Sequence, residues 1–183
     1  WRWAVALLTI LPVASAVVLI RTLPAETSRP ARGERGGIGR LVALVRNPVL
    51  VSATLTGCGT FFAFIAIYTY AAYRLEGAPF RLSATGVGFV FLLWLLGALA
   101  PTVGKLSERR GWRKVAATAM VLGAIGVALS LTSSLPVVVA GLGLVIFAAF
   151  SGQTAAALGQ GTSTDTDKGL ASAMYFSAYY TAG

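Results

Sequence analysis

The residues of this chain with the clearest chemical potential form one short basic segment, Gly104–Lys114. Five of its eleven side chains are Lys or Arg, and a single acid, Glu108, lies among them. Two long apolar runs, Leu82–Val103 and Val115–Thr132, flank the segment. We therefore expect a tight loop between two membrane helices, whose charges can form and break ion pairs.

Individual residues of this segment suit a latch, which here means a set of contacts that stabilises one conformational state of a protein and breaks in the other. Glu108 lies near the expected start of the next helix, where the positive end of the helix dipole stabilises an acid. Arg109 and Arg113 are close enough in sequence to pair with it. Gly104 and Gly111 permit a tight turn. The alternative interpretation is an ordinary positively charged loop with no gating role.

A second group of side chains suits the binding of a neutral or amphipathic organic molecule. Aromatic rings can stack on such a ligand, and hydroxyl or amide groups can add a few hydrogen bonds. The alternative is that the same side chains pack the helices together or lie at the membrane interface. These candidates recur at helical spacing within apolar runs and are Thr54, Phe61, Tyr68, Ser151, Gln153, Tyr175 and Tyr179.

The elements that position these residues follow from how charge is distributed. Only 11% of the 183 residues are charged, compared with about 25% in a soluble domain. No charged residue occurs within 49–73, 82–103 or 115–157. Uncharged apolar runs of this length predict transmembrane helices, so we expect an all-α, polytopic transmembrane helix bundle.

The order of the runs predicts three regions. Residues 1–20 form one membrane helix, and residues 48–183 form a bundle of about five helices. Residues 21–47 form a basic linker that ends in a surface helix, with one apolar stripe made of Ile38, Leu41, Val42 and Val45. The alternative is an ordinary solvated linker. Asn47 and Pro48 suit a helix start, because Asn caps and Pro tolerates the first turn, and Ser83 suits the cap of the next span. The chain lacks an initiator Met and stops within an apparent helix, so we interpret it as part of a longer protein.

The charges also predict orientation. Twelve of the fifteen Lys and Arg residues lie in the linker, the basic segment and at Lys168, all on one side of the membrane. The positive-inside rule places that side in the cytoplasm. Because the basic residues flank apolar runs, we attribute the net charge of +9 to membrane topology and not to a nucleic-acid partner. The absence of His and the single Cys58 within a span predict no disulfide, no metal site and no cofactor.

The basic segment and the order of the spans resemble the major facilitator superfamily of secondary transporters. The similar pattern is Gly104, three residues, an acid, Arg109, one residue, Gly111, one residue and two basic residues. Glu108 replaces the more usual Asp, and Trp112 occupies a position where a basic residue is common. One helix, a long linker and then five helices match the sixth helix, the central loop and the seventh to eleventh helices of that fold.

The resemblance implies a function and a location. It implies a monomeric, multi-pass protein of the plasma membrane (the bacterial inner membrane) that transports a small molecule by alternating access. The segments Leu44–Pro48 and Gly169–Tyr180 resemble those of drug and sugar-efflux antiporters, and this similarity implies proton-coupled export of a drug-like or sugar-like compound. The spans carry no acid, so we expect the proton-binding carboxylate to lie outside this chain. A polytopic membrane enzyme, a channel or a structural subunit are the alternatives, and an enzyme is disfavoured because no His or embedded acid is present.

Overall fold

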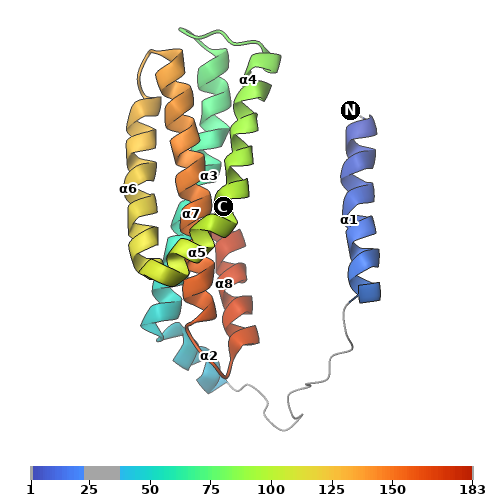
Figure 1. Cartoon of the computed structure of the whole chain (residues 1–183), viewed down its shortest axis with the longest axis vertical. Coiled ribbons are helices and arrows are strands. Elements are labelled where there is room, and N and C mark those ends of the chain that lie inside the picture. Colours follow the sequence, from blue (N-terminus) through green and yellow to red (C-terminus); the bar gives the residue numbers. More distant parts are fainter. Residues whose placement is uncertain (1, 23–37, 183) are drawn as a thin grey trace. The chain divides into compact units, whose positions relative to one another are not determined.

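The computed structural model describes residues 2–22 and 38–182, which form helices and turns without any strand (Figure 1). The chain divides into two units, Trp1–Gly37 and Ile38–Gly183. The first unit contains α1 (Arg2–Thr22), which includes Pro12, so a helix is present where the first one was predicted. The predicted linker residues 23–37 lie outside the described residues.

The second unit is a helix bundle in which α7 (Leu135–Gly161) lies centrally (Figure 1). It contacts α3 (Pro48–Glu76), α5 (Ala100–Arg110), α6 (Trp112–Ser130) and α8 (Lys168–Ala182). Four helical segments of the described chain are long and apolar enough to cross a membrane: α3, the continuous segment Ala84–Arg110, α6 and α7. The helices are α2 (Ile38–Val45), α3 (Pro48–Glu76), α4 (Ala84–Phe91), η1 (Leu92–Leu99), α5 (Ala100–Arg110), α6 (Trp112–Ser130), α7 (Leu135–Gly161) and α8 (Lys168–Ala182).

The predicted helix starts are confirmed by their capping bonds. The side chain of Asn47 accepts hydrogen bonds from the amides of Val49 and Leu50 at 2.9 and 3.3 Å, and Pro48 occupies the first turn of α3. The hydroxyl of Ser83 accepts from the amide of Gly86 at 3.3 Å at the start of α4. These bonds satisfy amides that have no partner inside their own helix.

The middle of the segment Ala84–Arg110 is a 3₁₀ helix, η1, which the sequence pattern did not predict. Pro101 has no amide hydrogen, so it cannot donate the α-helical bond to the carbonyl of Gly97. The amide of Ala100 donates to that carbonyl instead, which is the 3₁₀ pattern. The ring of Phe150 from α7 packs close to Gly97, where an added methyl group would lie 3.0 Å from it.

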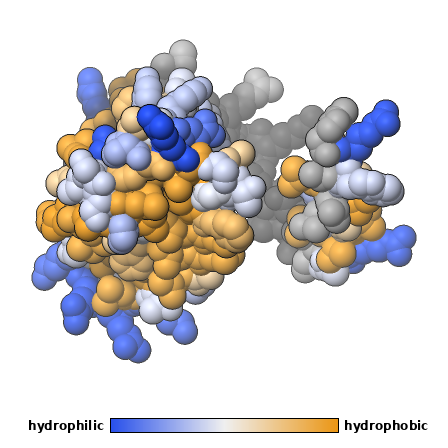
Figure 2. Space-filling view, turned by 90° about the horizontal axis from the view of Figure 1, so that it is seen from above, coloured by the Kyte–Doolittle hydropathy of each residue, from blue (hydrophilic) through white to orange (hydrophobic). Residues whose placement is uncertain are grey.

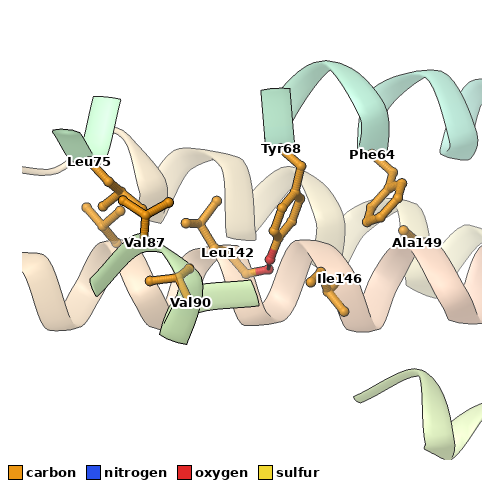
Figure 3. Packing of buried hydrophobic residues seen from close by; sticks show 9 residues of the cluster. Phe64, Tyr68, Leu75, Val87, Val90, Leu142, Ile146 and Ala149 are labelled. Carbon is orange, nitrogen blue, oxygen red and sulfur yellow. Dashed lines mark hydrogen bonds between the residues drawn. The ribbon is translucent and has the colours of Figure 1, made fainter. Parts of the chain in front are cut away.

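The main core lies between α3, α4 and α7 (Figure 3). Leu142 and Ile146 of α7 are almost fully buried and face Phe64, Tyr68 and Leu75 of α3. Figure 3 shows the Tyr68 hydroxyl pointing to α7, where it donates to the carbonyl of Leu142 at 3.4 Å. This hydrogen bond satisfies a polar group that is buried among hydrocarbon.

The outer surface of the bundle is largely apolar, as Figure 2 shows from one end. Many large hydrophobic side chains of α3, α4, η1 and α6 are exposed, including Leu55, Phe89, Leu95 and Val121. A water-soluble monomer rarely exposes apolar surface so extensively. This surface is the one expected for helices that contact lipid.

Candidate functional site

The basic segment is almost entirely helical, which corrects the predicted eleven-residue loop. Its first seven residues, including Gly104, belong to α5, and α6 begins again at Trp112. Only Gly111 lies between the two helices, with φ of +87° and ψ of 131°. This backbone conformation favours glycine, so Gly111 makes the sharp turn that the pattern assigned to a longer loop. Gly104 instead lies against Thr154 of α7.

The position of Glu108 also differs from the prediction. Glu108 lies in the last turn of α5, near the negative end of that helix dipole, and not at the start of α6. The ion pairs formed within the described residues are Arg40–Asp167 and Lys168–Asp165, so neither Arg109 nor Arg113 pairs with Glu108 there. Glu108 and Arg109 are exposed.

Arg113 and Trp112 form the start of α6. The Arg113 guanidinium lies 5.4 Å from the centre of the Trp112 ring, at the distance of a cation–π contact. Trp112 also packs against the buried cluster that includes Val103 and Ala155, and its ring lies over Gly159 of α7, where an added methyl group would come within 2.7 Å of it. Trp112 therefore anchors the turn against α7, a packing role that a basic side chain would not fill equally well.

The aromatic candidates Phe61, Tyr175 and Tyr179 come together where α3 meets α8. The rings of Phe61 and Tyr179 are stacked with their centres 4.4 Å apart. The Tyr175 hydroxyl lies so close to Gly57 that a methyl group there would be 2.5 Å away. Ala156 of α7 completes this cluster, which we call the α3–α8 aromatic cluster.

The polar groups of this cluster have unused hydrogen-bonding capacity. Within the described residues, no hydrogen bond is made by the hydroxyls of Tyr175 and Tyr179 or by the amide of Gln153. Gln153 is half-buried and lies three residues before Ala156, which places it on a nearby face of α7. Rings with free hydroxyls, and a free amide on a nearby helix face, are the kinds of groups that could hold a small organic molecule.

Three other candidates lie elsewhere. Tyr68 is buried in the core, with its hydroxyl bonded to Leu142, which favours a packing role. Ser151 faces a groove between α5, α6 and α7, on a different side of α7 from Ala156. Thr54 lines a separate groove between α2, α3 and α8.

The structure also identifies residues that the sequence pattern missed. Tyr180 presents its edge to Phe61 at 6.2 Å and is exposed, so it belongs beside the aromatic cluster. Its position next to Tyr179 was the available indication. Two bonds lie at the end of the bundle that contains α2. The side-chain amide of Gln160 in α7 donates to the hydroxyl of Ser172 in α8 at 3.0 Å. The side-chain amide of Asn47 donates to the backbone carbonyl of Ser163 at 2.7 Å. These bonds fasten the α7–α8 turn to its neighbours.

Comparisons with known proteins give one consistent match. The model of the Major Facilitator Superfamily matches residues 1–183. An uncharacterized MFS-type transporter, YybF, of Bacillus subtilis (strain 168) is 24% identical over 98% of this chain and 45% of its own length. An uncharacterized transporter of Buchnera aphidicola subsp. Baizongia pistaciae (strain Bp) is 26% identical with the same coverage. The chain thus spans about half the length of these relatives. No solved structure matches it.

Proposed function

Because this chain belongs to the major facilitator superfamily, a family of multi-pass membrane transporters, we propose that it forms part of a proton-coupled exporter of a small organic compound. In this proposal α1 ends the first half of the protein, residues 21–47 link the halves in the cytoplasm, and α3–α8 belong to the second half. The transporter works as a monomer in the plasma membrane and alternates access between the two sides.

The observation that carries the proposal is the α3–α8 aromatic cluster. Its stacked rings and unbonded hydroxyls suit an amphipathic or sugar-like ligand better than an ion, which would need charged or carbonyl ligands. The rings now contact each other, so a ligand between them requires α8 to move relative to α3. We assign proton coupling to a carboxylate outside residues 1–183, because the apolar runs here contain none.

The test is transport by the whole protein in liposomes with an imposed pH gradient, across a panel of amphipathic drugs and sugars. Uptake that depends on the gradient and is accompanied by proton movement is the expected result. Phe61→Ala and Tyr179→Phe should each weaken binding of the transported compound by about 2–10-fold, since each loses one stacking contact or one hydrogen bond.

Phe62→Ala is the matched control for these variants, because Phe62 is the neighbouring residue, is exposed and stacks on no aromatic ring among the described residues. Binding measured by ligand-dependent thermal stabilisation should be unchanged in this control. Normal affinity in both Phe61→Ala and Tyr179→Phe would place the substrate site elsewhere.

The proposed orientation leads to a separate prediction. With Cys58 replaced, single cysteines at Ala78 and Ser133 should react with an impermeant thiol reagent on intact cells, and a cysteine at Thr166 should not. All three positions are exposed, so accessibility within the protein does not limit labelling. Labelling of Thr166→Cys from outside, with protection of Ala78→Cys, would reverse the topology.

A further inference from the structure

A groove of about 320 Å³ lies between α5, α6 and α7, apart from the α3–α8 aromatic cluster. Its walls are mostly hydrocarbon, from Val103, Leu106, Val115, Leu122 and Phe147. Leu106 of α5 and Thr118 of α6 are exposed, so the groove is open on the outer surface of the bundle. An apolar groove of this kind can hold part of a hydrocarbon chain.

Two basic side chains, Arg110 and Lys114, lie at one end of the groove. Arg110 is the last residue of α5 and Lys114 lies in the first turn of α6, and both line the groove. Both are exposed, and neither is paired with an acid within residues 2–22 and 38–182. They also mark the end of the apolar run of α6, which is the depth at which lipid phosphates lie. An anion is therefore the group that this end would attract.

An unsatisfied hydroxyl lies deeper in the same groove. Ser151 is only 4% exposed, and its Oγ has no hydrogen-bond partner. The neighbouring hydroxyl of Thr118 is already bonded to the carbonyl of Lys114 at 2.9 Å, one helical turn or about 6 Å along α6. A buried hydroxyl without a partner is unfavourable, so an acceptor supplied by a ligand would stabilise it.

We propose that this groove binds an anionic phospholipid. The phosphate contacts Arg110 and Lys114, an ester carbonyl accepts from Ser151, and one acyl chain lies along Leu122 and Phe147. Three features favour this occupant. The two cations select an anion, and the remaining wall of the groove is apolar. The unpartnered hydroxyl of Ser151 is a donor for an ester of the glycerol, which follows the phosphate toward the acyl chains. A membrane protein meets this ligand at high concentration.

The test is native mass spectrometry of the whole protein, stripped of lipid in detergent and titrated with phosphatidylglycerol or phosphatidylcholine. We expect at least five-fold greater retention of phosphatidylglycerol. The double variant Arg110→Gln with Lys114→Gln should lose this preference, and Ser151→Ala should lower retention about two- to three-fold. Leu122→Trp should also lower retention by filling the acyl slot.

A charge-matched control separates this site from general attraction. Arg46→Gln with Lys105→Gln removes two exposed cations from the same end of the bundle, and neither lines the groove. This control should retain phosphatidylglycerol as the wild type does. An equal loss in both double variants would show diffuse electrostatic adsorption and overturn the proposal. Equal retention of phosphatidylcholine by the wild type would overturn it as well.

Discussion

Replacing Gly141 by alanine is expected to lower the free energy of unfolding of the whole protein by about 1–3 kcal/mol, the usual cost of an extra methyl group in a filled core. A methyl group there would lie 2.6 Å from the carbonyl oxygen of Gly126 and 2.8 Å from the amide nitrogen of Ser130. Both atoms belong to the backbone of α6, so no side-chain rotation can relieve the collision.

The same contact makes Gly126 equally sensitive. A methyl group at Gly126 would lie 2.7 Å from the carbonyl oxygen of Gly141, so the two glycines face each other across the α6–α7 contact. Small residues allow membrane helices to approach this closely and gain packing energy. Gly126→Ala and Gly141→Ala should therefore lower both the thermal midpoint in detergent and the amount of protein in the membrane.

Gly88→Ala provides the control for this prediction. Gly88 is also inside a helix, but it is exposed and no atom lies within 4 Å of an added methyl group. Its replacement should leave the midpoint unchanged or raise it slightly, because alanine favours a helix more than glycine does. If Gly88→Ala and Gly141→Ala shift the midpoint alike, the close α6–α7 approach is not what holds the bundle together.

The helices themselves could be predicted because their determinants are local. Uncharged runs mark the spans, and the side chains of Asn47 and Ser83 mark two helix starts by accepting hydrogen bonds from amides two or three residues away. The predicted surface helix is present as α2, but Leu44 and not its predicted apolar stripe packs onto the bundle. Leu41, Val42 and Val45 remain exposed, as a membrane-facing stripe would be.

The candidate site could be predicted only in part, because it depends on how each helix is rotated against its neighbours. Phe61 and Tyr179 were chosen for their spacing along their own helices. Their rings stack, and the small Ala156 of α7 packs in the same cluster. No local feature of the sequence distinguishes Tyr68 from Phe61. The two residues lie on the same face of α3, but the hydroxyl of Tyr68 donates to the carbonyl of Leu142 in the core. Similarly, Ser151 and Gln153 are two residues apart, so on a helix they point to different neighbours.

The basic segment failed as a loop prediction for a different reason. Its charges look like a solvated turn, but Lys, Arg, Glu and Leu are all good helix formers, and only Gly111 breaks the pattern. Extending α5 to Arg110 moves Glu108 away from the start of α6 and into the last helical turn. The dipole of α5 therefore does not stabilise the carboxylate of Glu108. This carboxylate also forms no ion pair with the described residues of the second unit.

We predict that Glu108 acts on the rate of transport and not on folding or substrate binding. Its exposed carboxylate at the end of α5 is free to contact a part of the protein outside the second unit, and such a contact can stabilise one access state. Glu108→Ala should cut the initial transport rate several-fold in liposomes, leave the thermal midpoint unchanged, and keep substrate affinity within a few-fold. Glu108→Gln should behave like alanine, whereas Glu108→Asp should retain most activity because it keeps the charge.

Glu76→Ala is the matched control, since Glu76 is an exposed acid that ends α3 at the opposite end of the bundle. It should transport at the wild-type rate. Because the aromatic cluster is built from residues of α3, α7 and α8 and includes no residue of the α5–α6 turn, a change in turnover without a change in affinity would separate gating from binding. Normal transport by well-inserted Glu108→Ala protein would exclude a latch at this carboxylate, and a lower thermal midpoint would assign Glu108 to folding instead.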